Sequence, residues 1–160
     1  MRWDDLAEQP CAIARTSAVI GDRWTMLILR DCFMGVRRFE AFQQRLGISR
    51  TVVTDRLAVL VREGVLRKVR YQDRPERFEY RLTEKGLDLY PLLLAMFRWG
   101  EKHYGEDAGP FVIHRHKTCG HDFHAVCACS ECGEPVDPRQ VEARAGPGMG
   151  GRPLGATASR

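Results

Sequence analysis

The sequence predicts a mainly α-helical fold with one small β-hairpin, followed by a small cysteine-rich appendage. Three observations lead to this prediction. Apolar residues recur at helical spacing from about position 11 to 63, the period falls toward two between 66 and 82, and four of the six cysteines lie between Cys119 and Cys132. The 160 residues suffice for one ordinary domain with an appendage, but not for two full-sized catalytic domains.

Four helices are expected before the hairpin. The spacing of apolar residues places them at Cys11–Ile20, Trp24–Phe33, Arg38–Leu46 and Arg50–Glu63. Gly21 and Asp22 form a turn between the first two, and Gly47 ends the third. Ser49 then offers a side-chain oxygen as N-cap of the fourth helix. That helix should bury Val53, Leu57 and Leu60.

The next elements are two strand-like runs that form a hairpin, Leu66–Tyr71 and Arg77–Leu82. The charged, turn-prone segment Gln72–Glu76 joins them. Thr83 then opens a long helix that runs to about Tyr104, and apolar residues nearly encircle it. A helix that is apolar on most sides must be covered on most sides, so we expect a second subunit to cover one face. Pro91 should kink this helix or mark its true start.

The positive charge of the chain is concentrated in one segment. The net charge is only +4, yet the stretch from Arg37 to Lys85 contains 13 basic and 7 acidic residues. Helix, glycine turn, helix and basic hairpin is the order of a winged helix-turn-helix, whose partner is double-stranded DNA. The residues expected to contact bases or phosphates are Arg37, Arg38, Ser49, Arg50, Thr51, Thr54, Arg67, Lys68, Arg74 and Arg77. The alternative is that these arginines form an ordinary solvated face.

Several spaced motifs resemble the HxlR-type family of MarR-related bacterial transcription regulators: Gly21–Asp31, Gly35–Phe39, Gly47–Ser49, Leu57, Leu60, Gly64, Glu79–Thr83 and Gly86. The resemblance covers roughly Cys11–Tyr104. It implies a homodimer that binds an inverted-repeat operator, with Ser49–Glu63 in the major groove and the Tyr71–Arg77 wing beside it. It also implies that the terminal helices, including the 84–104 helix, pair in the dimer. A repressor is expected, because most such dimers act by occlusion.

Two cysteines lie within the helical part. Some members of the resembling family sense oxidants through a cysteine near the N-terminus, and Cys11 lies at the matching place. Arg15, one turn later, could favour its thiolate. The alternative is that Cys11 is a small buried hydrophobe, which is the expected role of Cys32. Whether an oxidant, another ligand or no effector releases the DNA stays open.

The chain is expected to divide into four parts. Residues 1–104 form the winged-helix DNA-binding and dimerisation domain, and the polar Gly/Pro stretch 105–110 is a linker. Residues 111–144 form a Cys/His-rich, zinc-ribbon-like segment. Residues 145–160, dominated by Gly, Pro and small side chains, are expected to be disordered.

The Cys/His-rich segment contains two ligand pairs with x-x spacing, each followed by glycine. His116 pairs with Cys119, and Cys129 pairs with Cys132. Such a pair places two donors on one tight turn, and three thiolates with one imidazole select zinc. A closed structural Zn²⁺ site is therefore expected. The open alternatives are a metal-free tail or a different ligand set that uses His114, His121, His124 or Cys127.

The remaining features concern function class and cellular location. The sequence shows no Gly-rich phosphate loop, nucleophile elbow or His-Glu-x-x-His motif, so a regulator is expected rather than an enzyme. No apolar run approaches the length of a membrane span, and no secretory segment opens the chain, so the cytoplasm is the expected location. The rival function is a protein-interaction module, in which the winged helix is a scaffold and the zinc ribbon docks a partner.

Overall fold

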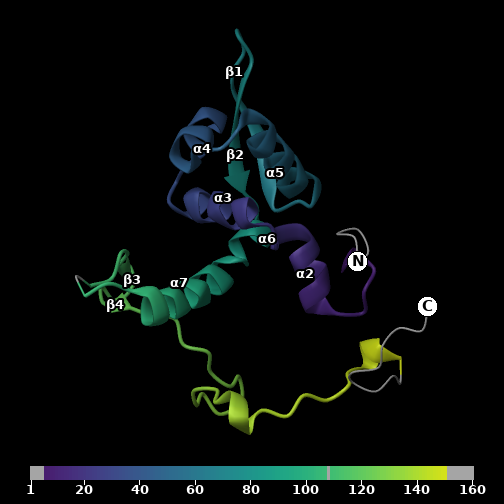
Figure 1. Ribbon diagram of the computed structural model, residues 1–160, viewed down its shortest axis with the longest axis vertical. Helices are drawn as coiled ribbons and strands as arrows, with labels where there is room; N and C mark the ends of the chain where they lie inside the picture. The colour runs from purple at the N-terminus through teal and green to yellow at the C-terminus, as the bar shows by residue number, and fades with distance from the viewer. Residues whose placement is uncertain (1–5, 108, 151–160) are drawn as a thin grey trace.

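The computed structural model describes residues 6–107 and 109–150. Three helices and a two-stranded hairpin pack together at one end of the molecule (Figure 1). The elements of this body are α3 (Arg23–Phe33), α4 (Phe39–Leu46), α5 (Arg50–Arg62), β1 (Leu66–Gln72) and β2 (Arg77–Leu82). Helix α2 (Ala12–Ile20) and helix α7 (Tyr90–Tyr104) leave the body in different directions. The observed order and arrangement confirm the predicted winged helix-turn-helix.

The turns between the helices follow from local chemistry. Asp22 caps α3, because its Oδ1 accepts hydrogen bonds from the backbone N–H groups of Trp24 (3.0 Å) and Thr25 (3.2 Å). Gly47 ends α4 in the left-handed conformation with φ 63°, and its N–H donates to the Gln43 carbonyl. Ser49 caps α5 as expected, with its Oγ accepting from Val52 N at 3.4 Å. These caps fix the angle between α4 and α5.

One apolar core holds the body together. Val53, Leu57 and Leu60 of α5 are fully buried, as the sequence predicts. They pack against residues from α2, α3, α4, the hairpin and α7; the other members of this cluster are Ile20, Ile28, Leu29, Cys32, Phe42, Val65, Leu66 and Leu93. Each buried side chain of this size contributes about 1.5–3 kcal/mol to folding. The core therefore holds the hairpin against α5.

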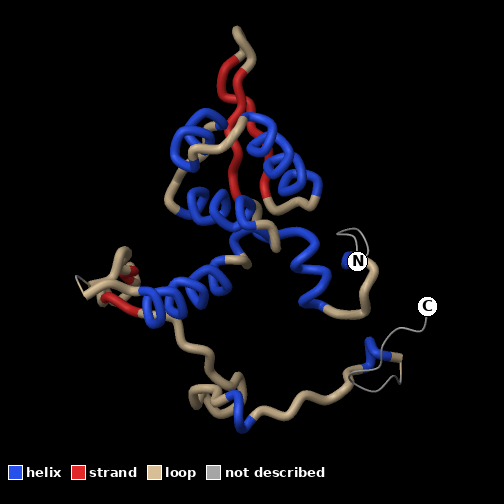
Figure 2. Tube along the Cα trace, in the orientation of Figure 1, coloured by secondary structure: helices blue, strands red, loops and turns tan. Residues whose placement is uncertain are grey.

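The hairpin is antiparallel and extends beyond the helices as a wing, shown in red in Figure 2. Its register pairs Leu66 with Leu82 at the base and Arg70 with Phe78 near the tip, and a bulge lies between Arg70 and Gln72. A further bridge joins Arg38, just before α4, to Glu79 of β2. The wing is thus tied to the start of α4.

The stretch from 84 to 104, predicted as one long helix that Pro91 would kink or truly begin, forms two helices. The chain forms the short helix α6 (Glu84–Leu87) and then starts again as α7 at Tyr90. Pro91 lies in the first turn of α7 and has no N–H to donate to a preceding carbonyl, so a helix that passed through it would lose a hydrogen bond. Of the two outcomes open for Pro91, the structure shows the true start of a helix.

Several apolar side chains of α2 and α7 are left uncovered by the described part of the chain. Ile13 on α2 is 78% exposed, and Met96 and Trp99 on α7 are 50% and 57% exposed. Only Leu93 of α7 and Ile20 of α2 are buried. These exposed faces lie on the two helices that leave the body.

The C-terminal extension begins where α7 ends. It contains the short antiparallel pair β3 (His114–Arg115) and β4 (Asp122–Phe123), then the 3-10 helices η1 (Pro138–Gln140) and η2 (Pro147–Met149). None of the described residues from 109 to 150 is buried. Of the tail expected to be disordered, residues 145–150 contain η2, and residues 151–160 lie outside the described part of the chain.

Candidate nucleic-acid interface

The N-terminal end of α5 presents polar side chains to solvent. Ser49, Arg50, Thr51 and Thr54 are all exposed there. The Thr54 hydroxyl donates to the Arg50 carbonyl at 2.9 Å, and the Ser49 hydroxyl oxygen caps the helix. In a helix-turn-helix this end of the second helix faces base edges, and these side chains offer both donors and acceptors.

Ion pairing divides the thirteen basic residues between 37 and 85 into two groups. Six are engaged within the protein: Arg45, Arg56, Arg62, Arg70 and Arg81 pair with carboxylates, and Lys85 donates to the Glu63 carbonyl at 2.6 Å. In the described part of the chain the remaining seven have no acidic partner. They are Arg37, Arg38, Arg50, Arg67, Lys68, Arg74 and Arg77, all of them exposed. These seven are the basic residues that the sequence assigns to DNA.

Aromatic rings hold three of these seven cations in place. Arg50 lies over the ring of Phe39 at 4.7 Å and Arg38 over Tyr71 at 4.9 Å, both measured to the ring centroid. Lys68 lies 3.9 Å from the centroid of Phe78. Such contacts orient a cation without neutralising its charge.

Sequence reasoning missed these aromatic supports, although the hairpin register could have revealed one of them. Lys68 pairs with Tyr80 across the hairpin, which makes Phe78 its diagonal neighbour. The other two contacts join segments that are far apart in sequence, so only the fold brings them together.

The tip of the wing contains both acidic and basic side chains. Arg70 pairs with Asp73 at 2.6 Å and with Glu76 at 3.4 Å, so one guanidinium contacts both acidic residues of the tip. Arg74 and Arg77 remain exposed beside them. The tip therefore presents net positive charge despite its carboxylates.

Buried and half-buried ion pairs position the helices behind this surface. Asp22, the cap of α3, also forms an ion pair with Arg56 of α5, whose Nε lies 3.3 Å from Asp22 Oδ1. Asp31 is fully buried and bonds Arg30 (2.8 Å) and Arg45 of α4 (3.3 Å). These contacts tie α3 to α4 and α5, and so fix the angle at which α5 is presented.

The two cysteines of the helical part lie in different surroundings. Cys11 is exposed and immediately precedes α2, whereas Cys32 is buried in the core. Burial raises the pKa of the Cys32 thiol from an ordinary 9.0 to about 12, and the charge of Asp31 adds to the effect. Arg15, which the sequence suggests as a partner of the Cys11 thiolate, donates from its Nε to the Gln9 carbonyl at 2.8 Å.

Both ligand pairs of the extension form tight turns. His116 Nδ1 lies 3.3 Å from Cys119 Sγ. The pKa of the Cys129 thiol is lowered by the backbone N–H groups of Cys132 and Glu131 and by the Cys132 thiol. Among residues 6–107 and 109–150, however, no three His, Cys, Asp or Glu side chains come close enough together to hold a metal. The structure thus forms each pair but does not join the two pairs within one chain.

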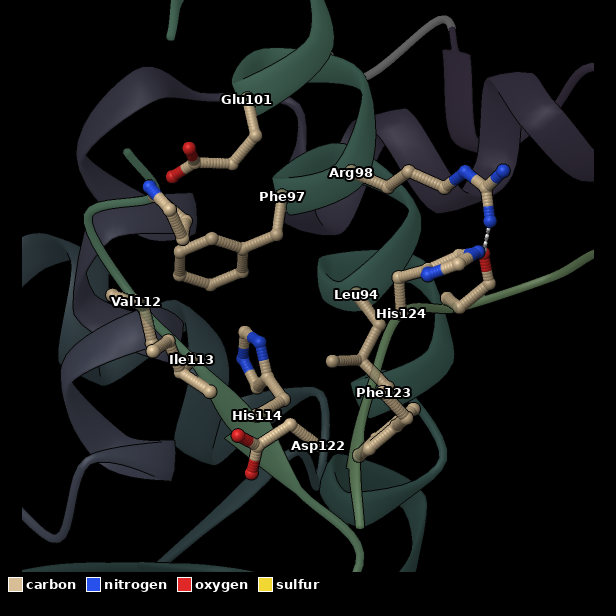
Figure 3. A pocket seen from close by; sticks show the side chains of 12 residues that line it. Leu94, Phe97, Arg98, Glu101, Val112, Ile113, His114, Asp122, Phe123 and His124 are labelled. Atoms are coloured by element: carbon tan, nitrogen blue, oxygen red, sulfur yellow. Dashed lines mark hydrogen bonds between the residues drawn. The ribbon is translucent and has the colours of Figure 1, made fainter. Parts of the chain in front are cut away.

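A pocket of about 430 Å³ lies between α7 and the β3–β4 hairpin (Figure 3). Phe97 and His114 meet there with ring centroids 5.0 Å apart, and Arg98 Nη1 donates to the Ala125 carbonyl at 2.6 Å. The Glu101 carboxylate accepts from Phe111 N at 3.1 Å. These contacts attach the start of the extension to α7.

No helix in the described part of the chain is both long and apolar enough to cross a membrane. Exposed large apolar side chains occur on α2, on α7 and in the extension, and singly at Met34, Tyr71 and Leu87.

Comparison with known proteins gives the same fold and function class. The chain is 41% identical over 138 residues to Rv3095 of Mycobacterium tuberculosis, an HTH-type transcriptional regulator, and covers 87% of that protein. It superposes on the crystal structure of PA1607, a candidate transcription factor, with a TM-score of 0.78 and 34% identity, over 87% of this chain and 97% of that one. The reduced form of the redox regulator HypR matches 57% of this chain and 92% of its own, with a TM-score of 0.54 and 31% identity.

The family match covers the part of the chain that carries the basic surface. The HxlR-like helix-turn-helix profile matches residues 19–108, from the end of α2 to just beyond α7. The matches to Rv3095 and PA1607 are longer and include part of the extension. Relatives and fold are those of transcriptional regulators rather than enzymes. The chain belongs to the HxlR-like helix-turn-helix family of transcriptional regulators.

Proposed function

We propose that this protein is a homodimeric, sequence-specific DNA-binding repressor that occupies an inverted-repeat operator. The observation that carries the proposal is the division of the basic residues. Seven cations on α5, before α4 and on the wing have no acidic partner among residues 6–107 and 109–150, while the other six of the same segment are engaged within the protein. Phosphates of a duplex would supply the missing counter-charges.

Two apolar surfaces support the homodimer. The exposed faces of α2 and α7 include Ile13, Met96 and Trp99. A groove of about 350 Å³ runs between α3 and α7, with Leu27, Leu93 and Met96 among its lining residues. Burying such faces against a second copy removes apolar area from water and places two recognition helices in one particle, as a two-fold operator requires.

Binding to randomised duplexes tests the DNA-binding part of the proposal. Selection of bound sequences should enrich an inverted repeat, and affinity should fall steeply as salt rises. Arg50→Ala should reduce the free energy of binding to the selected duplex by about 1–3 kcal/mol and relax the sequence preference at one base position. Lys68→Ala should weaken all duplexes alike and lower the salt slope by about one.

The matched control is Arg62→Ala. Arg62 is exposed on the same helix as Arg50 but pairs with Glu63, so its removal should leave affinity unchanged. The proposal fails if the purified protein binds duplexes no better than a neutral protein at low salt, or if all three variants behave alike.

We further infer that oxidation of Cys11 releases the DNA. The thiol is exposed at the N-terminal end of α2, where an oxidant can reach it, and the related fold of HypR belongs to a redox regulator. A mild oxidant should reduce operator binding by the native protein, and Cys11→Ser should abolish that response. Cys127→Ser is the control for an exposed thiol elsewhere. Equal responses of both variants would contradict a sensing role.

A further inference from the structure

The two ligand pairs of the extension form the same backbone turn. In the first, Gly120 N donates to the His116 carbonyl at 2.7 Å, and His116 N donates to the His121 carbonyl at 2.9 Å. In the second, Gly133 N donates to the Cys129 carbonyl at 2.9 Å, and Cys129 N donates to the Glu134 carbonyl at 2.9 Å. Both glycines adopt the left-handed conformation, with φ 74° and 76°. We call these turns the first knuckle (116–121) and the second knuckle (129–134).

Each knuckle points two donor atoms at a common position. His116 Nδ1 and Cys119 Sγ are 3.3 Å apart, which is close to the spacing of about 3.6 Å that a nitrogen and a sulfur have on one tetrahedral zinc ion. In the second knuckle, the same backbone turn places Cys129 and Cys132 at the positions that His116 and Cys119 occupy in the first. Each knuckle therefore presents half of a four-ligand site.

The fold keeps the two knuckles apart within one chain. The first closes the β3–β4 hairpin, which packs on α7 through His114 and Phe97. The second lies farther along the extension, below the hairpin in Figure 1 and close to η1. Arg98 Nη1 donates to the Ala125 carbonyl, which ties the connection between the knuckles to α7, and Val136 N donates to the Cys127 carbonyl at the base of the second knuckle. No third donor reaches either pair among the described residues.

The extension also lacks a covering surface of its own. None of its described residues is buried, and Phe111, Ile113 and Val126 are each more than half exposed. Each of these side chains lines a cleft beside α7, the helix on which the proposed dimer is built, and Trp99 shares its cleft with Val126. A second copy that packs there would bring its own knuckles to this surface.

We propose that a Zn²⁺ ion joins two copies of the chain, with His116 and Cys119 from one protomer and Cys129 and Cys132 from the other. The inference rests on the proposed homodimer. Three thiols lose their protons to solvent on binding, and a neutral imidazole completes a closed tetrahedral, structural site. Two-fold symmetry gives two such sites per dimer. The coordination bonds of each zinc ion would link the two protomers in addition to the apolar contacts of α2 and α7.

The geometry also separates these ligands from the alternatives. Cys127 lies outside both turns, and its carbonyl accepts from Val136 N. The His114 ring packs against Phe97 of α7. His121 closes the first knuckle through its carbonyl, as Glu134 closes the second, so it does not occupy one of the two repeated ligand positions. Cys127→Ala and His121→Ala are therefore matched controls that should leave the zinc content unchanged.

Mixed dimers distinguish a shared site from a site within one chain. One protomer carries His116→Ala with Cys119→Ala, and the other carries Cys129→Ala with Cys132→Ala, each with a different affinity tag for sequential purification. A shared site predicts about two zinc ions in the native dimer, about one in the mixed dimer and none in either variant homodimer, measured by elemental analysis without added metal. With cobalt(II) in place of zinc, the absorption of tetrahedral cobalt–thiolate sites should be halved in the mixed dimer relative to the native dimer and absent from both variant homodimers.

Every other outcome overturns the proposal. Zinc in the native dimer but none in the mixed dimer would place each site within one chain. A native dimer purified without zinc would show that the extension does not form a zinc site. Operator binding and light scattering are measured on the same samples, so loss of zinc with retained dimerisation and DNA binding leaves the proposed function standing. A monomer that holds one zinc ion would refute both the shared site and the proposed homodimer.

Discussion

Asp22 shows how one side chain serves both local and tertiary structure. Its Oδ1 accepts from two backbone N–H groups at the start of α3 and also pairs with Arg56 of α5. An N-cap needs only a short polar side chain at the right position, so this role is visible in the sequence. The contact with Arg56 depends on how α3 and α5 pack, so it is not visible in the sequence.

Replacing Asp22 should therefore destabilise the fold. Asp22→Ala removes the cap and leaves Arg56 without its carboxylate, and we expect a loss of about 1–2 kcal/mol in the free energy of unfolding. Urea denaturation measures it. Asp55→Ala is the control, because Asp55 is exposed within α5 and forms no ion pair in the described structure, and it should change stability by less than about 0.5 kcal/mol. Equal effects of the two variants would contradict the capping role.

The buried thiol of Cys32 makes stability depend on pH on the alkaline side. Its pKa rises to about 12 in the folded protein, so the unfolded state, with the lower pKa, releases its proton first as the pH increases. The stabilisation is complete below about pH 9 and declines as the pH rises toward 12.

Denaturation between pH 8 and 11 checks this effect. The native protein should lose more stability over this range than Cys32→Val, whose side chain has a similar size and no proton to release. Alkylation followed by mass spectrometry gives a second readout, since Cys32 should react only on unfolding. A native protein and a variant with parallel pH profiles would show that another group controls the alkaline decline.

At the scale of elements, the connection between the wing and α6 requires a glycine. A Cβ on Gly86 would lie 2.3 Å from the Val65 carbonyl oxygen, and that atom is backbone and cannot move aside cheaply. Thr83 further fixes this connection, because its hydroxyl donates to the Gly64 carbonyl at 2.6 Å and accepts from Gly86 N at 3.1 Å. The base of the wing and the start of α6 are thus packed as one unit.

Gly86→Ala should accordingly displace α6 or the base of the wing. We expect it to cost about 1–3 kcal/mol of stability by overpacking. Gly146→Ala is the control, because nothing lies within 4 Å of the added Cβ and its φ is negative. Thermal unfolding followed by circular dichroism compares the two. An unchanged melting temperature for Gly86→Ala would show that the backbone can relax at this contact.

At the scale of the whole molecule, one chain leaves its terminal helices incompletely covered. The body has a continuous core, yet α2 and α7 expose large apolar side chains. A helix-turn-helix reads only one half-site, so dimerisation decides operator affinity as well as stability.

Charge placed on α7 should separate the protomers. Met96→Asp puts a carboxylate in the apolar groove between α3 and α7, and light scattering should report a monomer. Affinity for a duplex with two half-sites should fall at least about tenfold, while affinity for a single half-site changes little. Gln44→Asp, on the exposed side of α4, should remain dimeric. A dimeric Met96→Asp protein would place the interface on a different face.

The sequence by itself determined the order and type of the elements from α2 to β2 and singled out the seven exposed basic residues that it assigns to DNA. Those features depend on short-range rules: apolar period, caps such as Asp22 and Ser49, and the turn at Gly47. The basic residues lie on exposed positions of these elements, so their placement follows from the same periodicity. The break before Tyr90 also depends on a local cause, since Pro91 can open a helix but not continue one.

Only the tertiary structure decided which groups far apart in sequence meet. The ring of Phe39 under Arg50, the pair of Asp31 with Arg45, and the separation of the two knuckles all depend on how elements pack in three dimensions. The x-x spacing of His116 and Cys119 determined each turn of the extension, because a turn involves few residues. It could not determine whether the second pair comes from the same chain, since that depends on the distance between elements, for which local spacing carries no information.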